Sequence, residues 1–388
     1  MGDRLPSAPW TQRADLAELV RALGADNVRY VGGAVRDTLL GLAVKDIDMA
    51  TLLPPAEVMA RLDRVRIGHV PTGLEHGTVT AILREGPVEI TTLRQDVATD
   101  GRRATVAFAR DWREDAARRD FTINALYADP ATLAVSDWFG GLGDLAARRV
   151  RFIGDARQRI REDHLRILRY FRFQARFGSL PADAEAEAAC AELAAMLKGL
   201  SRERVGMELL TLLALADPAP TVARMADLGV LAVILPEADP AALARLLTEE
   251  RRQDVAPDAI RRLAALLPAD PALAEQIAAR FRLSGAQKKR LGSAAGRGTT
   301  SPDARALAYR LGREPALDRL LIAGADATAL AGWAIPRFPI KGGDVVARGV
   351  QAGPEVARLL RAVEDRWVAE HFPDEARARA LLDEVVPR

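Results

Sequence analysis

The sequence predicts an α+β protein in which a mixed N-terminal part is followed by an all-helical remainder. Before residue 150, short β-like segments alternate with turns and helices. From about residue 156 onward, long segments rich in Ala, Leu and Arg repeat with a period of 3.6 residues. Because 388 residues exceed one ordinary hydrophobic core, we expect two or more domains.

The N-terminal part is expected to form one sheet covered by helices. Two helices are expected, one over residues 34–40 that ends at Gly41 and one over residues 55–63 that begins with proline. Glycines and prolines between residues 178 and 257 divide the remainder into several helices. The β-like segments are residues 28–31, 45–49, 78–83, 88–93 and 122–128.

Composition excludes several classes of protein. With 49% apolar and 28% charged residues, the chain is globular rather than disordered. Cys190 is the only cysteine, which excludes an intrachain disulfide and a Cys-rich zinc site and makes the cytoplasm the expected location. The longest apolar run, residues 230–235, is too short to cross a membrane. Since the net charge is only +2, any RNA-binding surface must be a local patch.

A Gly-Gly turn at residues 31–37 (VGGAVRD) is the first candidate site, because an apolar strand there runs into a helix. Gly33 allows close approach of the backbone to a phosphate, and Arg36 can add a charge-assisted contact. The alternative is a tight strand-to-helix connection that binds nothing.

Paired carboxylates at Asp46 and Asp48 form the second candidate site. They lie two residues apart on a β-like segment and share one face, while Ile47 and Met49 face the core. Adjacent carboxylates repel unless cations neutralise them, and two Mg²⁺ ions held there suit in-line phosphoryl transfer. Glu89, on another β-like segment, could complete the site. The alternative is a solvated edge strand.

Two arginine-rich segments follow. In residues 118–125 (RRDFTINA), Arg119 suits a triphosphate or a ribose, and a structural Asp–Arg pair is the alternative. Residues 161–169 are expected to form one helix, with Asp163 and Arg166 three residues apart on neighbouring positions of one face. This pair can offer an acceptor and donors to the edge of C or A, whereas the alternative is an ordinary surface salt bridge.

Together these segments resemble the bacterial class II CCA-adding enzyme and poly(A) polymerase family. The resemblance covers roughly residues 29–176 and extends weakly to residues 201–204 (SRER). It implies a polymerase-β-like nucleotidyltransferase head with a small mixed sheet at residues 1–152, a helical neck at 153–210, and a helical body and tail at 211–388. The segments that carry it are residues 31–37 (VGGAVRD), 45–51 (KDIDMAT), 72–80 (TGLEHGTVT), 88–94 (VEITTLR), 118–126 (RRDFTINAL), 139–145 (FGGLGDL) and 161–169 (REDHLRILR).

The resemblance also implies roles for single residues. Asp46 and Asp48 would hold Mg²⁺, with Glu89 as the third catalytic carboxylate. The helical-face argument supports Arg172 less well than the others, because at 100° per residue it drifts away from Asp163. Contacts with the nucleotide are implied for Gly33, Arg36, Arg119, Asp163, Arg166, Arg169 and Arg172.

The implied activity is template-independent addition of C, C and A from CTP and ATP to the 3′ end of tRNA, with the body and tail binding the acceptor arm. Residues 100–108 look like an intact version of a loop that is shortened in enzymes adding only CC, which favours addition of A as well. A poly(A) polymerase adding AMP to RNA 3′ ends is the alternative, since residues 124–127 (NALY) resemble that variant equally. A catalytically silent RNA-binding module and a small-molecule nucleotidyltransferase are disfavoured by the acidic pair and the long helical half. No membrane and no obligate protein partner are expected.

Basic residues of the helical part are further candidates for contacts with RNA phosphates. They are Lys288, Lys289, Arg290 and Arg297. A solvated basic face is the alternative.

Overall fold

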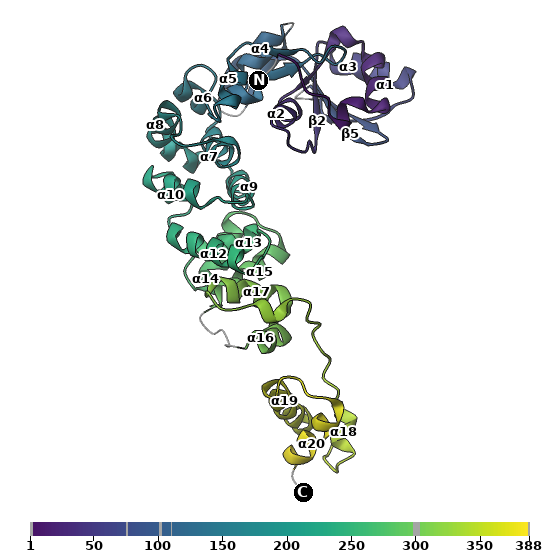
Figure 1. Ribbon diagram of the computed structural model, residues 1–388, viewed down its shortest axis with the longest axis vertical. Helices are drawn as coiled ribbons and strands as arrows, with labels where there is room; N and C mark the ends of the chain where they lie inside the picture. The colour runs from purple at the N-terminus through teal and green to yellow at the C-terminus, as the bar shows by residue number, and fades with distance from the viewer. Residues whose placement is uncertain (1–2, 75–76, 101–102, 110, 298–302, 387–388) are drawn as a thin grey trace. The chain divides into compact units, whose positions relative to one another are not determined.

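The computed structural model describes residues 3–74, 77–100, 103–109, 111–297 and 303–386 (Figure 1). The chain divides into two compact units. Unit 1 comprises Met1–Leu212 and Arg224–Ile234, and unit 2 comprises Leu213–Ala223 and Leu235–Arg388. The boundary expected between head and neck stays a prediction, because both segments belong to unit 1. Among the described residues, no helix has the length and apolar character needed to cross a bilayer.

The described part of unit 1 contains a mixed seven-stranded sheet with the order β3-β4-β5-β2-β1-β8-β9. The strands β2 and β5 are parallel, and the other neighbouring pairs are antiparallel, so the expectation of a small mixed sheet is confirmed. A separate antiparallel hairpin joins β6 (Arg94–Asp100) to β7 (Arg103–Phe108). The sheet strands are β1 (Val28–Val31), β2 (Ile47–Thr51), β3 (Gly68–Gly73), β4 (Thr78–Leu83), β5 (Gly86–Thr92), β8 (Leu126–Ala128) and β9 (Val135–Asp137).

Several strands differ from the sequence-based expectation. The segment 122–128 is a strand only in β8, because Thr122–Asn124 forms a 3₁₀ turn instead. The strand β3 was not expected, because its sequence GHVPTG carries glycine and proline and lies at the exposed edge of the sheet, where no apolar alternation is required. The strand β2 begins at Ile47, so Asp46 lies one residue before it.

Helices α1 and α3 illustrate how apolar spacing builds unit 1. Leu16, Leu19 and Leu23 recur at helical spacing on α1 and are buried, as are Val58 and Leu62 on α3. The helices of the first part of the chain are α1 (Ala14–Leu23), α2 (Gly33–Leu39), α3 (Pro55–Arg64), α4 (Trp112–Ala117), α5 (Gly141–Ala146), α6 (Ala156–Glu162), α7 (Arg166–Phe177), α8 (Ala184–Leu193), α9 (Arg202–Leu213), α10 (Ala219–Asp227) and α11 (Val230–Ile234).

The expectation of one continuous helix over residues 161–169 is wrong. Helix α6 ends at Glu162, α7 begins at Arg166, and Asp163 between them is extended with φ −148°. The carboxylate of Asp163 accepts the backbone N–H of Leu165 at 3.1 Å, and its carbonyl accepts that of Arg166 at 3.0 Å. An aspartate that bonds to nearby backbone groups competes with helix formation, which explains the break.

The described part of unit 2 is helical, as expected. Several of its helices begin after an aspartate whose carboxylate accepts a backbone N–H of the first turn, for example Asp239, Asp258 and Asp374. The helices are α12 (Pro240–Arg252), α13 (Ala259–Leu266), α14 (Pro271–Arg280), α15 (Gly285–Ala295), α16 (Ala304–Leu311), α17 (Arg313–Ile322), α18 (Gly342–Val346), α19 (Pro354–Ala369) and α20 (Glu375–Val385).

Two basic residues that were candidates for RNA contact have structural partners instead. Arg290 forms ion pairs with Asp318 at 2.7 Å and Asp258 at 2.9 Å. Arg297 donates to the carbonyls of Ala264 at 3.3 Å and Leu267 at 2.6 Å, at the end of α13. These contacts hold helices of unit 2 together and engage guanidinium donors of both arginines.

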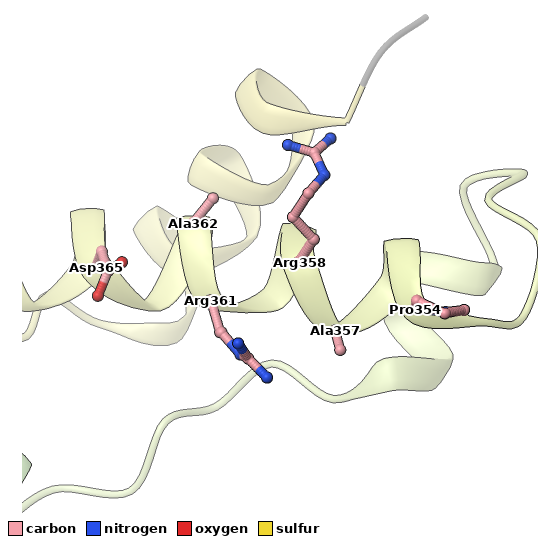
Figure 2. A pocket seen from close by; sticks show the side chains of 6 residues that line it. All are labelled: Pro354, Ala357, Arg358, Arg361, Ala362 and Asp365. Carbon is pink, nitrogen blue, oxygen red and sulfur yellow. The ribbon is translucent and has the colours of Figure 1, made fainter.

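A hollow of about 460 Å³ lies along α19. In Figure 2 the side chains of Arg358 and Arg361, three residues apart on this helix, extend in different directions. Since Arg358 is paired with Glu355 at 2.5 Å and the lining comes from one helix stripe, the hollow has no convergent set of reactive groups. Its lining residues are Pro354, Ala357, Arg358, Arg361, Ala362 and Asp365.

Candidate functional site

The carboxylates of Asp48 and Glu89 come together through strand register. The parallel strands β2 and β5, both labelled in Figure 1, pair Asp48 with Glu89 and Met49 with Ile90. Met49 and Ile90 are buried, so strand alternation leaves both acids on the opposite face. A cavity of about 240 Å³ opens there, lined by Val31, Asp48, Met49, Glu89, Thr91, Arg94, Arg118 and Arg119.

The electrostatics of this cavity favour a bound cation. Burial raises the pKa of Asp48 above its usual value, the negative charges of Glu89 and Asp46 raise it further, and the positive charge of Arg119 opposes them. A divalent cation would relieve the repulsion between these carboxylates, and carboxylate oxygens are the ligands that Mg²⁺ prefers. The donor set therefore fits the expected metal.

Asp46 is placed differently from Asp48. It is exposed and lies one residue before β2, so strand pairing does not fix the direction of its side chain. Within the described residues, no three His, Cys, Asp or Glu side chains form a ready metal cluster. The structure thus brings Asp48 and Glu89 into one cavity and leaves Asp46 beside it.

The Gly-Gly turn brings α2 close to Arg119. Gly32 has φ 66°, which strains any residue with a side chain, and a Cβ there would lie 3.3 Å from a guanidinium nitrogen of Arg119. Gly33 begins α2. The turn therefore shapes the backbone beside the cavity wall, while a phosphate contact at Gly33 stays a prediction.

Arg36 is turned into the protein. It is only 6% exposed, and its guanidinium bonds to Asp37 at 2.8 Å and to Asn124 at 2.5 Å. It also stacks on the ring of Phe177 in α7, with 4.1 Å between the guanidinium carbon and the ring centroid. The sequence suggested that Arg36 binds a phosphate, whereas the structure shows a buried side chain that connects α2 to α7.

A second cavity contains the predicted base-reading residues. Its volume is about 300 Å³. Because Arg118 and Arg119 line both cavities, they form a wall between the two carboxylates of the first cavity and the base-reading candidates of the second. The lining residues are Arg118, Arg119, Asp120, Asp163, Leu165, Arg166, Arg169 and Arg204.

Asp163 and Arg166 are held by separate partners. The carboxylate of Asp163 accepts a hydrogen bond from Arg204 at 3.0 Å. Arg166 donates to Glu162 at 2.8 Å and to the carbonyl of Arg118 at 3.0 Å. Both side chains are thus fixed at the cavity without pairing with each other in the described contacts, so the alternative of a simple salt bridge between them is wrong.

Arg169 and Arg172 have different surroundings. Arg169 lines the second cavity and bonds to Asp120 at 2.8 Å. Arg172 bonds to Glu208 at 2.6 Å, stacks on Phe173 and does not line this cavity. The helical-face argument, which supported Arg172 less well, agrees with this placement.

Three polar residues that line the second cavity were not among the predicted site residues. Arg118 and Asp120 flank Arg119 in the segment RRD, so their signal was already in view. Arg204 lies on α9, where the segment SRER resembled the family only weakly. The prediction for residues 100–108 lies largely outside the described residues, because residues 101 and 102 and the side chains of residues 95–108 are not described.

Two family profiles match the chain. The profile described as "Poly A polymerase head domain" matches residues 28–151. A second, described as "Probable RNA and SrmB- binding site of polymerase A", matches residues 182–242. The first match contains both acids of the sheet cavity, and the second contains Arg204.

Known proteins resemble most of the chain. The CCA tRNA nucleotidyltransferase 1, mitochondrial, of Mus musculus is 34% identical over 88% of this chain and 82% of its own length. A CCA-adding enzyme of Streptococcus pyogenes is 47% identical over a shorter stretch, 40% of this chain and 38% of its own length. The crystal structure of the Bacillus stearothermophilus CCA-adding enzyme in complex with CTP superposes with a TM-score of 0.73 at 27% identity, covering 97% of this chain and 98% of that one. The chain therefore belongs to the CCA tRNA nucleotidyltransferase family, which carries the poly(A) polymerase head domain.

Proposed function

We propose that this protein adds C, C and A, taken from CTP and ATP, to the 3′ end of tRNA without a nucleic-acid template. The observation that carries the proposal is the pair of adjoining cavities that share Arg118 and Arg119. One offers carboxylates to a metal-bound triphosphate, and the other offers polar side chains to a base. A nucleoside triphosphate lying across the arginine wall would reach both.

The first cavity would handle the phosphates. Asp48 and Glu89, with Asp46 beside them, would hold the divalent ions, which supply activation of the attacking hydroxyl and neutralisation of the pyrophosphate. The guanidinium groups of Arg118 and Arg119 face the same space and offset the negative charge of the triphosphate. These side chains position the reacting groups, which is most of what phosphoryl transfer requires of a protein.

The second cavity would choose the base. An ionised Asp163 only accepts hydrogen bonds, and Arg166 only donates them. On their Watson–Crick edges C and A both present an amino donor next to a ring-nitrogen acceptor, whereas U and G present a carbonyl next to an N–H. A fixed acceptor beside a fixed donor therefore fits C and A and excludes the other two bases. Arg204 and Glu162 hold the pair in place, so no template strand is needed.

The relatives support this proposal, because proteins named CCA-adding enzymes share the family and the fold. The CCA-adding enzyme of Thermotoga maritima complexed with tRNA matches at a TM-score of 0.72 and 21% identity, which supports the fold alone. A poly(A) polymerase is the second candidate, favoured by the names of the two family profiles.

One experiment separates the two candidates. The protein is incubated with Mg²⁺ and tRNA lacking its last three nucleotides, with labelled CTP, labelled ATP or both. We expect two C residues from CTP alone, and one further A only when both nucleotides are present. A long A tract from ATP alone would identify a poly(A) polymerase, and no transfer to tRNA under any condition would overturn the proposal.

For the cellular location we propose the cytoplasm, on the evidence of a single cysteine, Cys190, which is buried and unpaired. The relatives from Mus musculus and Homo sapiens are named mitochondrial. Fractionation of cells with an antibody against the protein tests this location.

A further inference from the structure

Asp115 is a buried carboxylate that the proposed function has not used. It lies on α4, is 1% exposed and lines neither cavity of the site. Its first oxygen accepts from the guanidinium of Arg118 at 2.8 Å and from the backbone N–H of Arg94 at 3.1 Å. Its second oxygen accepts from Arg119 at 3.3 Å and from the hydroxyl of Tyr127. One carboxylate thus gathers donors from three parts of unit 1.

The geometry ties both arginines of the cavity wall to this carboxylate. Arg118 and Arg119 follow Asp115 by three and four residues, the spacings that bring side chains together around a helical turn. Arg119 is held a second time, because its Nε donates to the Tyr127 hydroxyl at 2.9 Å and that hydroxyl donates to Asp115. Arg119 therefore sits in a closed triangle of hydrogen bonds.

The ionisation states of Asp115 and Tyr127 suit these hydrogen bonds. Burial acts to raise the pKa of Asp115, but the positive charges of Arg119 and Arg118 outweigh it and hold the pKa below its usual value. Burial raises the pKa of Tyr127, so its hydroxyl keeps its proton and remains a donor. The ionised carboxylate thus cancels one of two neighbouring positive charges and leaves the other for an anion.

We propose that Asp115 is a positioning residue of the nucleotide site, acting through Arg118 and Arg119. It fixes both guanidinium groups at the wall between the two cavities, with their remaining N–H donors toward the triphosphate or ribose. The proposal rests on the proposed function, because that function gives the arginines their nucleotide contact. It goes further by naming the residue that orients them, which lies outside both cavities.

The test starts from Asp115→Asn, which keeps the shape of the side chain and removes its charge. Calorimetry gives the Kd of CTP, ATP and inorganic pyrophosphate, and steady-state assays on tRNA lacking its last three nucleotides give KM and kcat. We expect Kd and KM to rise by about tenfold for both nucleotides, because a charged hydrogen bond to each arginine is lost. Pyrophosphate binding should weaken in parallel, and the ratio of C to A selection should not change.

Two further variants separate positioning from folding. Tyr127→Phe keeps the ring and removes only the bridge between Asp115 and Arg119, so Kd should rise by roughly threefold, less than in Asp115→Asn. Asp111→Asn makes the same substitution at the exposed N-cap of the same helix, where the side chain accepts a hydrogen bond from the backbone N–H of Arg113. It should leave every Kd unchanged. If Asp115→Asn does not fold, Tyr127→Phe carries the test by itself.

The decisive comparison uses a background that lacks both arginines, Arg118→Ala/Arg119→Ala. Adding Asp115→Asn to this background should change the KM for CTP by less than about twofold, because the groups through which it acts are gone. Suppose that the background binds CTP more weakly and that adding Asp115→Asn weakens CTP binding tenfold again. Asp115 is then only structural and the inference is wrong. The inference is equally wrong if Asp115→Asn has no effect on CTP binding in the wild-type protein. If the background itself binds CTP normally, the nucleotide contact in the proposed function is refuted, and this inference with it.

Discussion

Replacing Arg36 with alanine should destabilise unit 1 rather than mainly weaken nucleotide binding. The sequence suggested that Arg36 meets phosphate, so the substitution would weaken all nucleotides equally. In the structure the guanidinium is buried, bonds to Asp37 and Asn124, and lies over the rings of Phe177 and Phe173 at 4.1 and 5.3 Å. Alanine removes all of these contacts at once.

The loss of stability in Arg36→Ala can be estimated from the contacts that the substitution removes. A desolvated guanidinium–ring contact contributes about 2 kcal/mol, and a charged hydrogen bond about 1.5–3 kcal/mol. Asp37 stays buried and keeps an ion pair with the exposed Arg176 at 3.3 Å, which offsets part of the loss. We therefore expect the free energy of unfolding to fall by roughly 3–5 kcal/mol, a large share of the stability of an ordinary domain.

The assay combines urea unfolding with hydrogen–deuterium exchange read peptide by peptide. Faster exchange should appear in α2 and α7 and not in α19 or α20 of unit 2. Arg176→Ala is the matched control, because it removes the exposed partner of Asp37 and should cost less than about 1 kcal/mol. Unchanged stability in Arg36→Ala, together with an equal loss of affinity for all four triphosphates, would refute the reasoning and restore the phosphate role.

Three further predictions concern the site and its RNA. Asp48→Asn should abolish transfer and leave the unfolding midpoint unchanged or higher, since it removes a partly buried charge facing Glu89. Residual transfer with Mg²⁺ present would contradict the metal assignment. Asp163→Ala should admit UTP or GTP and slow correct addition. The reason is that loss of a hydrogen bond of about 1–3 kcal/mol alters base selection by roughly tenfold. Ratios of kcat/KM for the four triphosphates that equal those of the wild type would show that this residue does not read the base. The affinity for tRNA should fall steeply with added salt as counterions are released, and a flat dependence in filter binding would argue for a small substrate.

Much of the sheet could be predicted, because the local pattern of apolar and polar residues determines where its strands lie. Strands β1 and β4 lie at their expected residues and are largely buried. The pairing of an acid from β2 with an acid from β5 follows from strand alternation once the two strands are neighbours. The break between α6 and α7 was not predictable, because the apolar period continues across it. The hydrogen bond from Leu165 to the carboxylate of Asp163 and the extended backbone of Asp163 show where the helix stops.

The site was predictable where its residues share a short segment and not where they meet through the fold. Arg119, Asp163 and Arg166, which line the cavities, each stand in a recognisable segment. The pairing of Asp163 with Arg204 joins residues 41 positions apart, and the stacking of Arg36 on Phe177 joins two helices distant in the chain. Contacts of this kind depend on tertiary packing, which no local spacing reveals.

The shared arginine wall has a consequence for accuracy. Because Arg118 and Arg119 line both cavities, the proposed function links the fit of the base to the alignment of the phosphates. In that function, a base that fits poorly against Asp163 would also displace the triphosphate that the two arginines align, so a mismatch at the base would also disturb the reacting atoms. The protein would then discriminate twice in one binding event, once through weaker binding and once through slower chemistry.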